Sequence, residues 1–152
     1  MRSLEGIYIA NKIDPKIMEE HKQEINEEMI QNNENLGDQD QHHQKIHNHA
    51  TKEIANFVET VITFNKGGKW TPLTAPERDS SGKKYDCGEN CYLHLHGVNS
   101  KFPQFYSVEK AVGIILGNGN VGKYLSHNEE DLSTFLSRDG GLSWFEVNHN
   151  LI

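Results

Sequence analysis

The stretch from Ser137 to Trp144 reads SRDGGLSW, and a related stretch from Thr63 to Trp70 reads TFNKGGKW. In a hairpin, the Asp or Asn of such a line accepts hydrogen bonds from backbone N–H groups of the turn, and the Gly supplies a positive φ. The hydroxyl joins the same network, and the Trp packs across the base of the hairpin. We therefore predict two tight turns with a structural role. The defining residues are Thr63, Asn65, Gly67, Trp70, Ser137, Asp139, Gly141 and Trp144.

Apolar and β-branched runs on both sides of the turns predict β-strands. The expected strands are GIYIA, TVITF and KWTPL around the first turn, and CYLHLHG, AVGIILG, STFLS and SWFEV around the second. The second group looks like the first with one strand added, and the two turn motifs lie 74 residues apart. Repeats of four antiparallel strands are typical of β-propellers. The predicted fold is all-β, with two four-stranded antiparallel blades of which the first is incomplete.

These strands predict the organisation of the chain. Residues 1–13 and 57–76 form the incomplete blade, residues 14–56 an acidic low-complexity insert, residues 77–90 the loop between the blades, and residues 91–152 the second blade. Each blade then contains one of the two turn motifs.

The net charge of the protein falls in the insert and the residues directly after it. The formal net charge of the 152 residues is −7, and residues 14–59 alone hold eleven acids and four bases, so the remainder is neutral. Asp14 and Pro15 are typical of a helix start, which predicts a partly helical beginning. The run QNNENLGDQDQHHQKIHNH that comes after it has too few apolar residues to offset the entropy of ordering, and we predict that it is disordered.

Composition also excludes two kinds of partner. The neutral remainder has no basic surplus for binding nucleic acid. No apolar run approaches the length of a membrane span, and the N-terminus lacks the apolar core of a signal peptide. We therefore expect no nucleic-acid partner and no direct membrane contact from this segment. If the segment belongs to a larger protein, these absences say nothing about the parent.

Cys87 and Cys91 are the two cysteines of the chain, in the sequence CGENC. A zinc site would need two more ligands nearby. A tight disulfide is the simpler interpretation, and it would indicate an oxidising compartment. Two free thiols in a reducing compartment are the alternative.

The histidines of interest fall into two groups. His94 and His96 lie two residues apart on a predicted strand, so they share one of its faces. Three interpretations are open. The two histidines are half-buried side chains bonded to neighbouring backbone, or a pH-sensitive pair, or two metal ligands that lack a third. The second group lies in the insert, where a disordered tract would hold a metal weakly, and we expect no metal site and no cofactor. Its members are His42, His43, His47 and His49.

The run GNGNVG, from Gly117 to Gly122, matches part of a dinucleotide-binding fingerprint. That motif requires a helix directly after it, and the next residues, KYLSHNEED, make a poor helix. We expect instead that AVGIILG forms a strand and that the glycine-rich run is the turn at its end.

The two turn motifs resemble Asp-boxes, which recur in sialidase-like propellers and in the ten-bladed propeller of sortilin-type sorting receptors. The chain is similar to the second group, since GIYIAN, TVITFNKGGKWTPLTAP, CGENCYLHLHG, AVGIILGNGNVG and SRDGGLSWFEV follow one another in this order. In that family a cysteine pair precedes the strand that corresponds to CYLHLHG. The resemblance covers residues 1–12 and 57–147. The chain departs from the family in its long insert, in Asn65 where Asp is usual, and in the short gap between its cysteines.

The resemblance implies about two blades from the lumenal propeller of a single-span membrane receptor. Such a receptor binds peptide or protein cargo reversibly and carries it between the Golgi, endosomes and the cell surface. The remaining blades of the parent propeller are then partners of this segment, and no catalytic residue is expected. Members of the family release cargo in acidic endosomes, which favours the pH-sensitive interpretation of His94 and His96.

Asp-boxes also raise two alternative functions. A sialidase-like glycoside hydrolase needs an arginine cluster around the substrate carboxylate and a tyrosine paired with an acid. The chain has three arginines, and Arg138 lies inside a turn motif, so the sequence does not favour an enzyme. The second alternative is another Asp-box interaction protein, which would share the propeller but bind a different partner.

Overall fold

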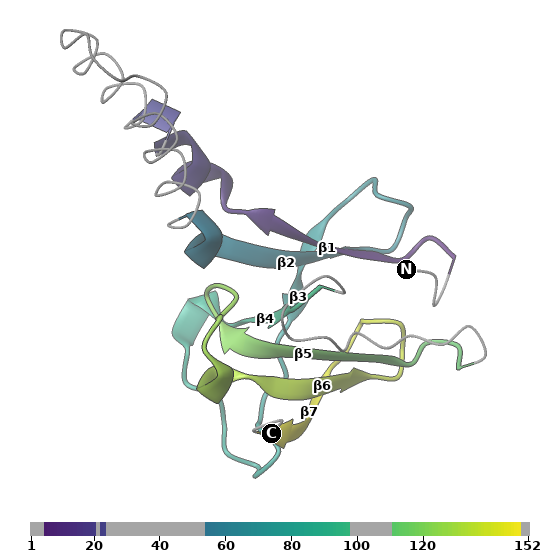
Figure 1. The fold of residues 1–152 in the computed structure, drawn as a ribbon. Helices are drawn as coiled ribbons and strands as arrows, with labels where there is room; N and C mark the ends of the chain where they lie inside the picture. The colour runs from purple at the N-terminus through teal and green to yellow at the C-terminus, as the bar shows by residue number, and fades with distance from the viewer. Residues whose placement is uncertain (1–4, 21, 24–53, 98–110, 150–152) are drawn as a thin grey trace, which may run out of the picture. The chain divides into compact units, whose positions relative to one another are not determined.

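Seven β-strands make up most of the structure, which is a computed structural model that describes residues 5–20, 22–23, 54–97 and 111–149 (Figure 1). They lie in one sheet in the order of the sequence, and the pairs from β2 to β7 are antiparallel. The prediction of an all-β fold is confirmed. The strands are β1 (Tyr8–Ile13), β2 (Val58–Thr63), β3 (Thr71–Thr74), β4 (Tyr92–Leu95), β5 (Ile115–Gly122), β6 (Ser133–Ser137) and β7 (Phe145–His149).

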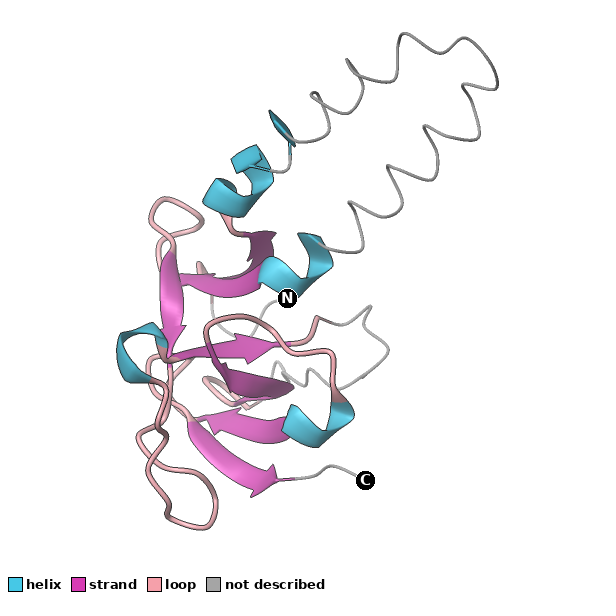
Figure 2. Cartoon of the chain, turned by 90° about the vertical axis from the view of Figure 1, so that its left-hand side faces the viewer, coloured by secondary structure: helices cyan, strands magenta, loops and turns pink. Residues whose placement is uncertain are grey.

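Short helices occur only between the strands in the described residues (Figure 2). Three are single 3₁₀ turns, at Ala55–Phe57, Gly88–Asn90 and Glu129–Asp131. The chain divides into two compact units, one containing Met1–Lys12 with Glu59–Ile152 and the other containing Ile13–Val58. The first unit therefore holds both turn motifs.

The short strand β3 changes its partner halfway along its length. Val61 and Ile62 of β2 pair with Pro72 and Thr71, whereas Leu73 and Thr74 pair with β4. Pro72 has no N–H to donate, and such a residue is tolerated where no second strand needs one. The strand therefore continues past Pro72 to Thr74. Because β3 pairs with both β2 and β4, it joins the strands that we expected in two separate blades into one strand order.

Among the described residues, one apolar cluster takes side chains from the strands around both turns. Leu73 and Leu93 are fully buried, as is Phe135, and they belong to one packed cluster. The cluster takes side chains from β2, β3, β4, β5 and β6 and from the turn before β7. Its members are Ile62, Leu73, Leu93, Leu95, Ile115, Phe135 and Trp144. Burial of these side chains is the main force that holds the strands around both turns together.

The glycine-rich run lies inside β5 and does not form the turn that we expected. Gly119 pairs with Leu95, and a β-carbon at Gly119 would lie 1.7 Å from the carbonyl oxygen of His94. Only a residue without a β-carbon allows β4 and β5 to approach this closely. The resemblance to a dinucleotide-binding fingerprint is thus explained by strand packing.

In the second unit the expected helix start is present. The Asp14 carboxylate accepts a hydrogen bond from the Lys16 N–H (3.0 Å), and residues 15–20 are helical. The Asp14 N–H donates to the Phe57 carbonyl (3.0 Å), so the two ends of the insert meet within this unit. Residues 24–53, which include the four insert histidines and the whole of the tract that we predict to be disordered, lie outside the described residues.

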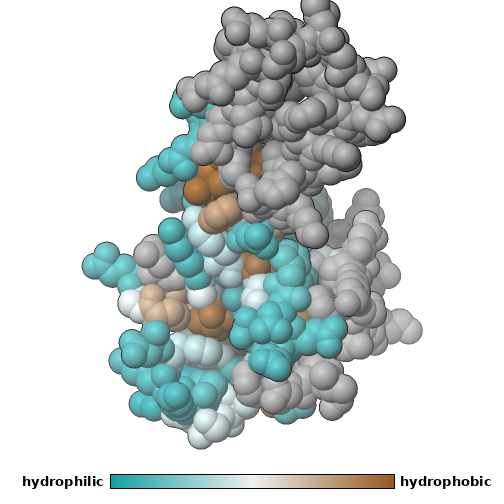
Figure 3. Space-filling model, turned by 60° about the vertical axis from the view of Figure 1, so that its left-hand side comes forward, coloured by the Kyte–Doolittle hydropathy of each residue, from teal (hydrophilic) through white to brown (hydrophobic). Residues whose placement is uncertain are grey.

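The surface of the described residues is mixed in character. Figure 3 shows one face, on which hydrophilic residues predominate and hydrophobic ones occupy small areas. Several large apolar side chains are partly exposed, with exposed fractions between 41% and 65%. They include Tyr8, Phe64, Trp70, Val112, Leu142, Phe145 and Val147.

Candidate functional site

The turn between β6 and β7 is closed by the Asp139 side chain. Ser137 Oγ donates to Asp139 Oδ1 (2.9 Å) and accepts from the Gly141 N–H (2.8 Å). Both polar groups of Ser143 donate to the same carboxylate, the N–H to Oδ1 (2.9 Å) and the hydroxyl to Oδ2 (2.5 Å). These bonds, above all the one from the Ser143 hydroxyl, lower the pKa of Asp139 from 3.8 to about 2. The carboxylate serves to order its own loop.

The turn between β2 and β3 repeats this arrangement with an amide. Thr63 Oγ1 donates to Asn65 Oδ1 (2.9 Å) and accepts from the Gly67 N–H (3.2 Å). The Lys69 N–H donates to Asn65 Oδ1 (2.9 Å), as the Ser143 N–H does to Asp139. Replacement of Asp by Asn therefore keeps the oxygen that closes the loop and removes only the charge.

The backbone of the two turns is also alike. The two residues after the Asp or Asn have positive φ in each turn, 62° and 96° for Lys66 and Gly67, and 74° and 97° for Gly140 and Gly141. Glycine adopts this conformation without a steric penalty, whereas a residue with a β-carbon does so at a cost. Lys66 is the only such residue among those the structure describes.

The tryptophans of the two motifs differ in their packing. Trp144 is 3% exposed, and its Nε1 donates to the Gly141 carbonyl (3.1 Å). Trp70 holds the same position in the first motif but is 41% exposed. Trp144 is buried as expected for the base of a hairpin, and Trp70 is not.

A third turn of related construction was not singled out by the sequence. Asp79 Oδ1 accepts from the N–H and hydroxyl of Ser81 (2.9 and 2.6 Å) and from the Lys83 N–H (2.9 Å). The Ser81 hydroxyl bond is the main reason why the pKa of Asp79 is lowered. Asp79 and Lys83 have the same four-residue spacing as Asp139 and Ser143. The sequence signal for this turn is Asp79 followed three residues later by Gly82, in the stretch predicted only as the loop between the blades.

The disulfide lies immediately before β4. Cys87 and Cys91 are joined, with their Cα atoms 5.0 Å apart, and the 3₁₀ turn Gly88–Asn90 forms the loop between them. Of the alternatives that the sequence left open, the structure has the bridge and no free thiol.

A polar junction connects β1, β2 and β4 beside the core. The Thr60 N–H donates to His94 Nδ1 (3.1 Å), and the Leu95 N–H donates to Thr60 Oγ1 (2.9 Å). The Thr60 hydroxyl donates to Asn11 Oδ1 (2.7 Å), and Asn11 Nδ2 donates to the Leu95 carbonyl (3.0 Å). Thr60 and His94 are 0% and 1% exposed. These side-chain bonds connect β2 to β4 where β3 does not lie between them.

His96 lies directly after the end of β4 and has other partners. Its Nε2 is 2.9 Å from the Ser126 carbonyl, and its ring centroid is 5.5 Å from that of His127. Burial is the main reason why the pKa values of His94 and His96 are both lowered. Both side chains are buried and bonded to backbone, which agrees with the first of the three interpretations. Whether either of them responds to pH stays a prediction.

A cleft of about 440 Å³ lies between the loop after β3 and the strands β5 to β7. At its edge the Tyr85 hydroxyl donates to Glu146 Oε2, and the Ser80 hydroxyl donates to Glu146 Oε1 (3.3 Å). Four described lining residues are acidic and none is Lys or Arg. The described lining residues are Asp79, Ser80, Ser81, Tyr85, Asn120, Val121, Glu130, Asp131, Ser133, Phe135 and Glu146.

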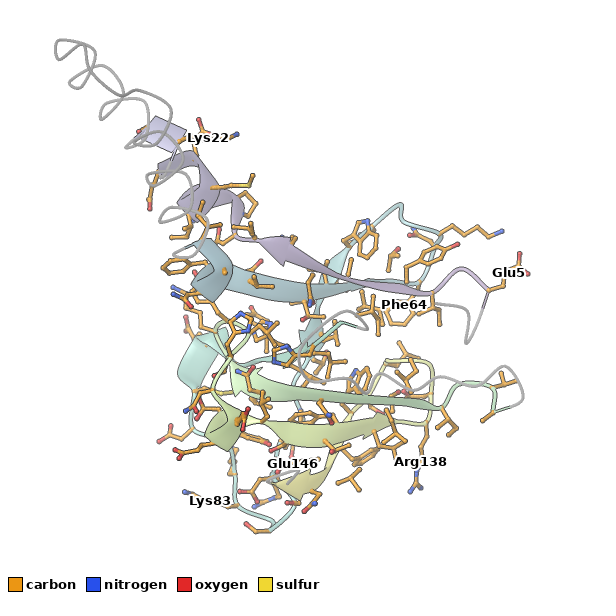
Figure 4. The ribbon with its side chains drawn as sticks, viewed as in Figure 1. Glu5, Lys22, Phe64, Lys83, Arg138 and Glu146 are labelled. Carbon is orange, nitrogen blue, oxygen red and sulfur yellow. A yellow bond between two sulfur atoms is a disulfide. The ribbon has the colours of Figure 1, made fainter. Side chains whose placement is uncertain are left out.

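The described arginines do not line this cleft. Arg138 lies at the turn between β6 and β7, and Lys83 lies in the loop before β4, both at the periphery (Figure 4). The Arg78 guanidinium donates to the Gly82 carbonyl in its own loop (2.9 Å). The cleft is therefore an acidic environment, which is unfavourable for an anionic substrate.

The described ranges carry neither a metal cluster nor a membrane span. No three His, Cys, Asp or Glu side chains are grouped there in a way that would hold a metal ion. No helix of this part of the chain has both the length and the apolarity needed to cross a bilayer.

Comparisons with known proteins connect this fold to a family. The family described as Sortilin-Vps10, "Sortilin, neurotensin receptor 3", matches residues 1–151. Three relatives share the name "Vacuolar protein sorting/targeting protein 10". The protein from Paracoccidioides lutzii is 41% identical over 105 residues, and that from Eremothecium gossypii is 46% identical over 102 residues. Each match covers 63% of this chain and 7% of the relative.

The third relative, from Kluyveromyces lactis, is 45% identical over 96 residues, which is 59% of this chain and 6% of that protein. The chain thus spans less than a tenth of the length of the curated relatives that it matches. The family match along almost the whole length of the chain agrees with the all-β sheet and its two related turns. The chain belongs to the Sortilin-Vps10 family.

Proposed function

We propose that this chain is part of the lumenal, cargo-binding propeller of a sorting receptor. The match of the family to residues 1–151 carries this proposal, and the names of the relatives describe protein sorting. The cargo is a peptide or protein, and the receptor carries it between the Golgi, endosomes and the cell surface. The further blades of the same propeller are the immediate partners of these strands.

The chemistry of the described residues supports binding rather than catalysis. Asp139 and Asn65 use their side-chain oxygens to close their own turns, so neither is available to a substrate. Asp79 does the same in the third turn. The most polar residues of the three turns therefore have a structural role, and the mechanism that we propose is reversible association without bond making or breaking.

A chimeric receptor tests this function. In Kluyveromyces lactis, the segment of the sorting protein that matches this chain is replaced by the corresponding residues of this chain. The fraction of soluble vacuolar proteins secreted by the cells is then measured. We expect the chimera to hold secretion near the level of the native receptor, because a segment 45% identical can complete the same propeller.

A matched control carries Ser137→Ala and Asp139→Ala in the same chimera. Removing the side chains that close the β6–β7 turn is expected to raise secretion toward that of cells without a receptor. A chimera of normal abundance and location that secretes as much as cells without a receptor would contradict the proposal.

One observation favours a hydrolase as second candidate, namely the Tyr85–Glu146 pair in the cleft. A tyrosine paired with an acid is the nucleophile of sialidases. Against this, the four acidic groups that line the cleft repel a sialic acid carboxylate, and no described arginine faces it. We expect no cleavage of a fluorogenic sialoside by the chain. Turnover that is lost in Tyr85→Phe would establish the hydrolase and overturn the receptor proposal.

A further inference from the structure

The hydrogen bonds of His94 fix the position of its proton. Nδ1 lies 3.1 Å from the Thr60 nitrogen, whose hydrogen points to the ring, so Nδ1 is an acceptor and carries no proton. Nε2 lies 3.1 Å from the Gly122 carbonyl oxygen, which can only accept. The ring is therefore neutral, with its hydrogen on Nε2. Both nitrogens have a backbone partner, one from β2 and one from the end of β5.

A second proton on this ring has no acceptor. It would be added at Nδ1, where it would point at the Thr60 N–H, so two donors would face each other. Thr60 is 0% exposed, and no water replaces the lost acceptor without a separation of the strands. A buried N–H without a partner is costly. The charged ring is thus compatible with the fold only if β2 moves away from β4 at this point.

Further hydrogen bonds of the junction also require β2 and β4 to lie close together. Thr60 Oγ1 accepts from the Leu95 N–H, and Asn11 bonds to both Thr60 and Leu95. The ladder of β3 ends before this region, since β3 pairs with β2 only at Val61 and Ile62. Backbone pairing therefore does not hold β2 against β4 beside Thr60, and side-chain bonds do.

The charged and titratable groups near His94 come from several of the strands around it. Glu59 of β2 favours the protonated ring, and it forms an ion pair with Lys12 of β1 (3.3 Å) that reduces its effect. A backbone hydrogen bond at Lys123, after β5, also favours the charged form. Just after the end of β4, His96 contacts Ser126 and His127. Burial outweighs the favourable groups and lowers the pKa of His94.

From this geometry we infer that His94 is a proton-sensitive latch between β2 and β4, closed when the ring is neutral and released when Nδ1 is protonated. The inference concerns the strand junction alone and does not depend on the proposed cargo function.

The direction of the effect follows from the lowered pKa. The open junction binds a proton near the ordinary pKa of histidine, about 6.5, and the closed junction binds one only at lower pH. Closure is therefore fully favoured above about pH 6.5 and weakens as the pH falls below it. For one proton, the opening constant rises about tenfold for each pH unit between the two pKa values.

Amide hydrogen exchange in the full 152-residue chain tests the latch, with intrinsic exchange rates divided out. Between about pH 7 and pH 5, we expect Thr60 and Leu95 to lose protection about tenfold for each pH unit below the open-state pKa. The amides of β6, which lies between β5 and β7, are expected to keep theirs. Constant protection of Thr60 across this range, or an equal loss in β6, would overturn the inference.

Two variants separate His94 from its neighbours. His94→Asn places an amide oxygen near the position of Nδ1 and cannot be protonated, so the protection of Thr60 should become independent of pH. His127→Asn, at an exposed histidine beside His96, should keep the wild-type dependence. The same slope in His94→Asn as in the wild type would refute the role of His94.

If His94→Asn does not fold, ring ¹⁵N shifts of the wild type decide the question. We expect an unprotonated Nδ1 at pH 7.5, and its protonation should follow the loss of Thr60 protection. A ring that is protonated while Thr60 stays protected would refute the latch.

Discussion

A β-carbon on Gly141 would lie 2.5 Å from Cδ1 of Ile62. Gly141 belongs to the turn before β7 and Ile62 to β2, so the second turn motif packs against the strand that leads into the first. Gly141 therefore has two functions, since it supplies a φ of 97° to its turn and leaves room for a core side chain. The spacing of the motif predicted only the first of these.

The variant Gly141→Ala is expected to destabilise the fold. The positive φ costs an L-residue about 1–2 kcal/mol, and the contact with Ile62 adds to this cost. Urea denaturation measures the change. Gly82→Ala is a matched control, because Gly82 has a φ of 86° but a β-carbon there would have no neighbour within 4 Å. Equal losses in the two variants would show that the Ile62 contact contributes nothing.

The variant Lys66→Gly is expected to stabilise the first turn. Lys66 has a φ of 62°, at the position where the second turn has Gly140. Relief of this strain should raise the free energy of unfolding by about 0.5–1 kcal/mol, after the entropy of the glycine in the unfolded chain is deducted. The lost ion pair with Glu5 is exposed and contributes little. Thermal melting beside Lys69→Gly provides the comparison, and a lower melting temperature for Lys66→Gly than for the wild type would contradict the prediction.

Acid should weaken the second turn more than the first. The pKa of Asp139 is lowered to about 2, so the folded state holds its carboxylate charged at a pH where the unfolded chain is protonated. The stability that this residue contributes is present above about pH 3.8 and is lost as the pH falls toward 2.

Asp139→Asn is expected to fold, as the amide at Asn65 does in its turn, but to lack this part of the pH dependence. Asn65→Asp should add a similar dependence, since its oxygen already accepts from Lys69. Urea midpoints between pH 2 and 5 measure both effects. A wild type and an Asp139→Asn variant with parallel pH profiles would show that the carboxylate is not coupled to folding.

The two tryptophans should respond differently to replacement by phenylalanine. Trp144 is buried and donates to Gly141, so Trp144→Phe loses volume and a hydrogen bond and should cost about 1–2 kcal/mol. Trp70 is 41% exposed, and Trp70→Phe should cost less than about 0.5 kcal/mol. Because the chain has two tryptophans, each variant leaves one of them, whose fluorescence is then measured alone. Blue-shifted emission in Trp144→Phe, where Trp70 alone remains, would contradict the exposure of Trp70.

The turns were the most predictable part of the molecule, because their bonds are local. Ser137, Asp139 and Gly141 lie within five residues, and the Ser137 hydroxyl bonds to both the Asp139 carboxylate and the Gly141 N–H. The strands beside them were predictable for the same reason, since alternation and β-branching act within one strand.

Long-range contacts were beyond the reach of sequence patterns. Thr60 and His94 are 34 residues apart, and neither type of side chain indicates that the two will meet. The need for glycine at position 119 of β5 comes from the nearby carbonyl oxygen of His94, which belongs to the neighbouring strand. The pairing of Tyr85 with Glu146 likewise joins segments 61 residues apart. Motif spacing carries no information on such pairs.

The division of β3 between two neighbours determines how the strands on its two sides are directed relative to each other. Thr71 and Pro72 pair with β2, and Leu73 and Thr74 pair with β4, so a single peptide bond separates the residues that pair with the two neighbours. A change of backbone direction at that bond would turn the strands on one side relative to those on the other, while the hydrogen bonds within each tight turn stayed intact. The four residues of β3 therefore determine how the hairpin of β2 is directed relative to the strands from β4 to β7.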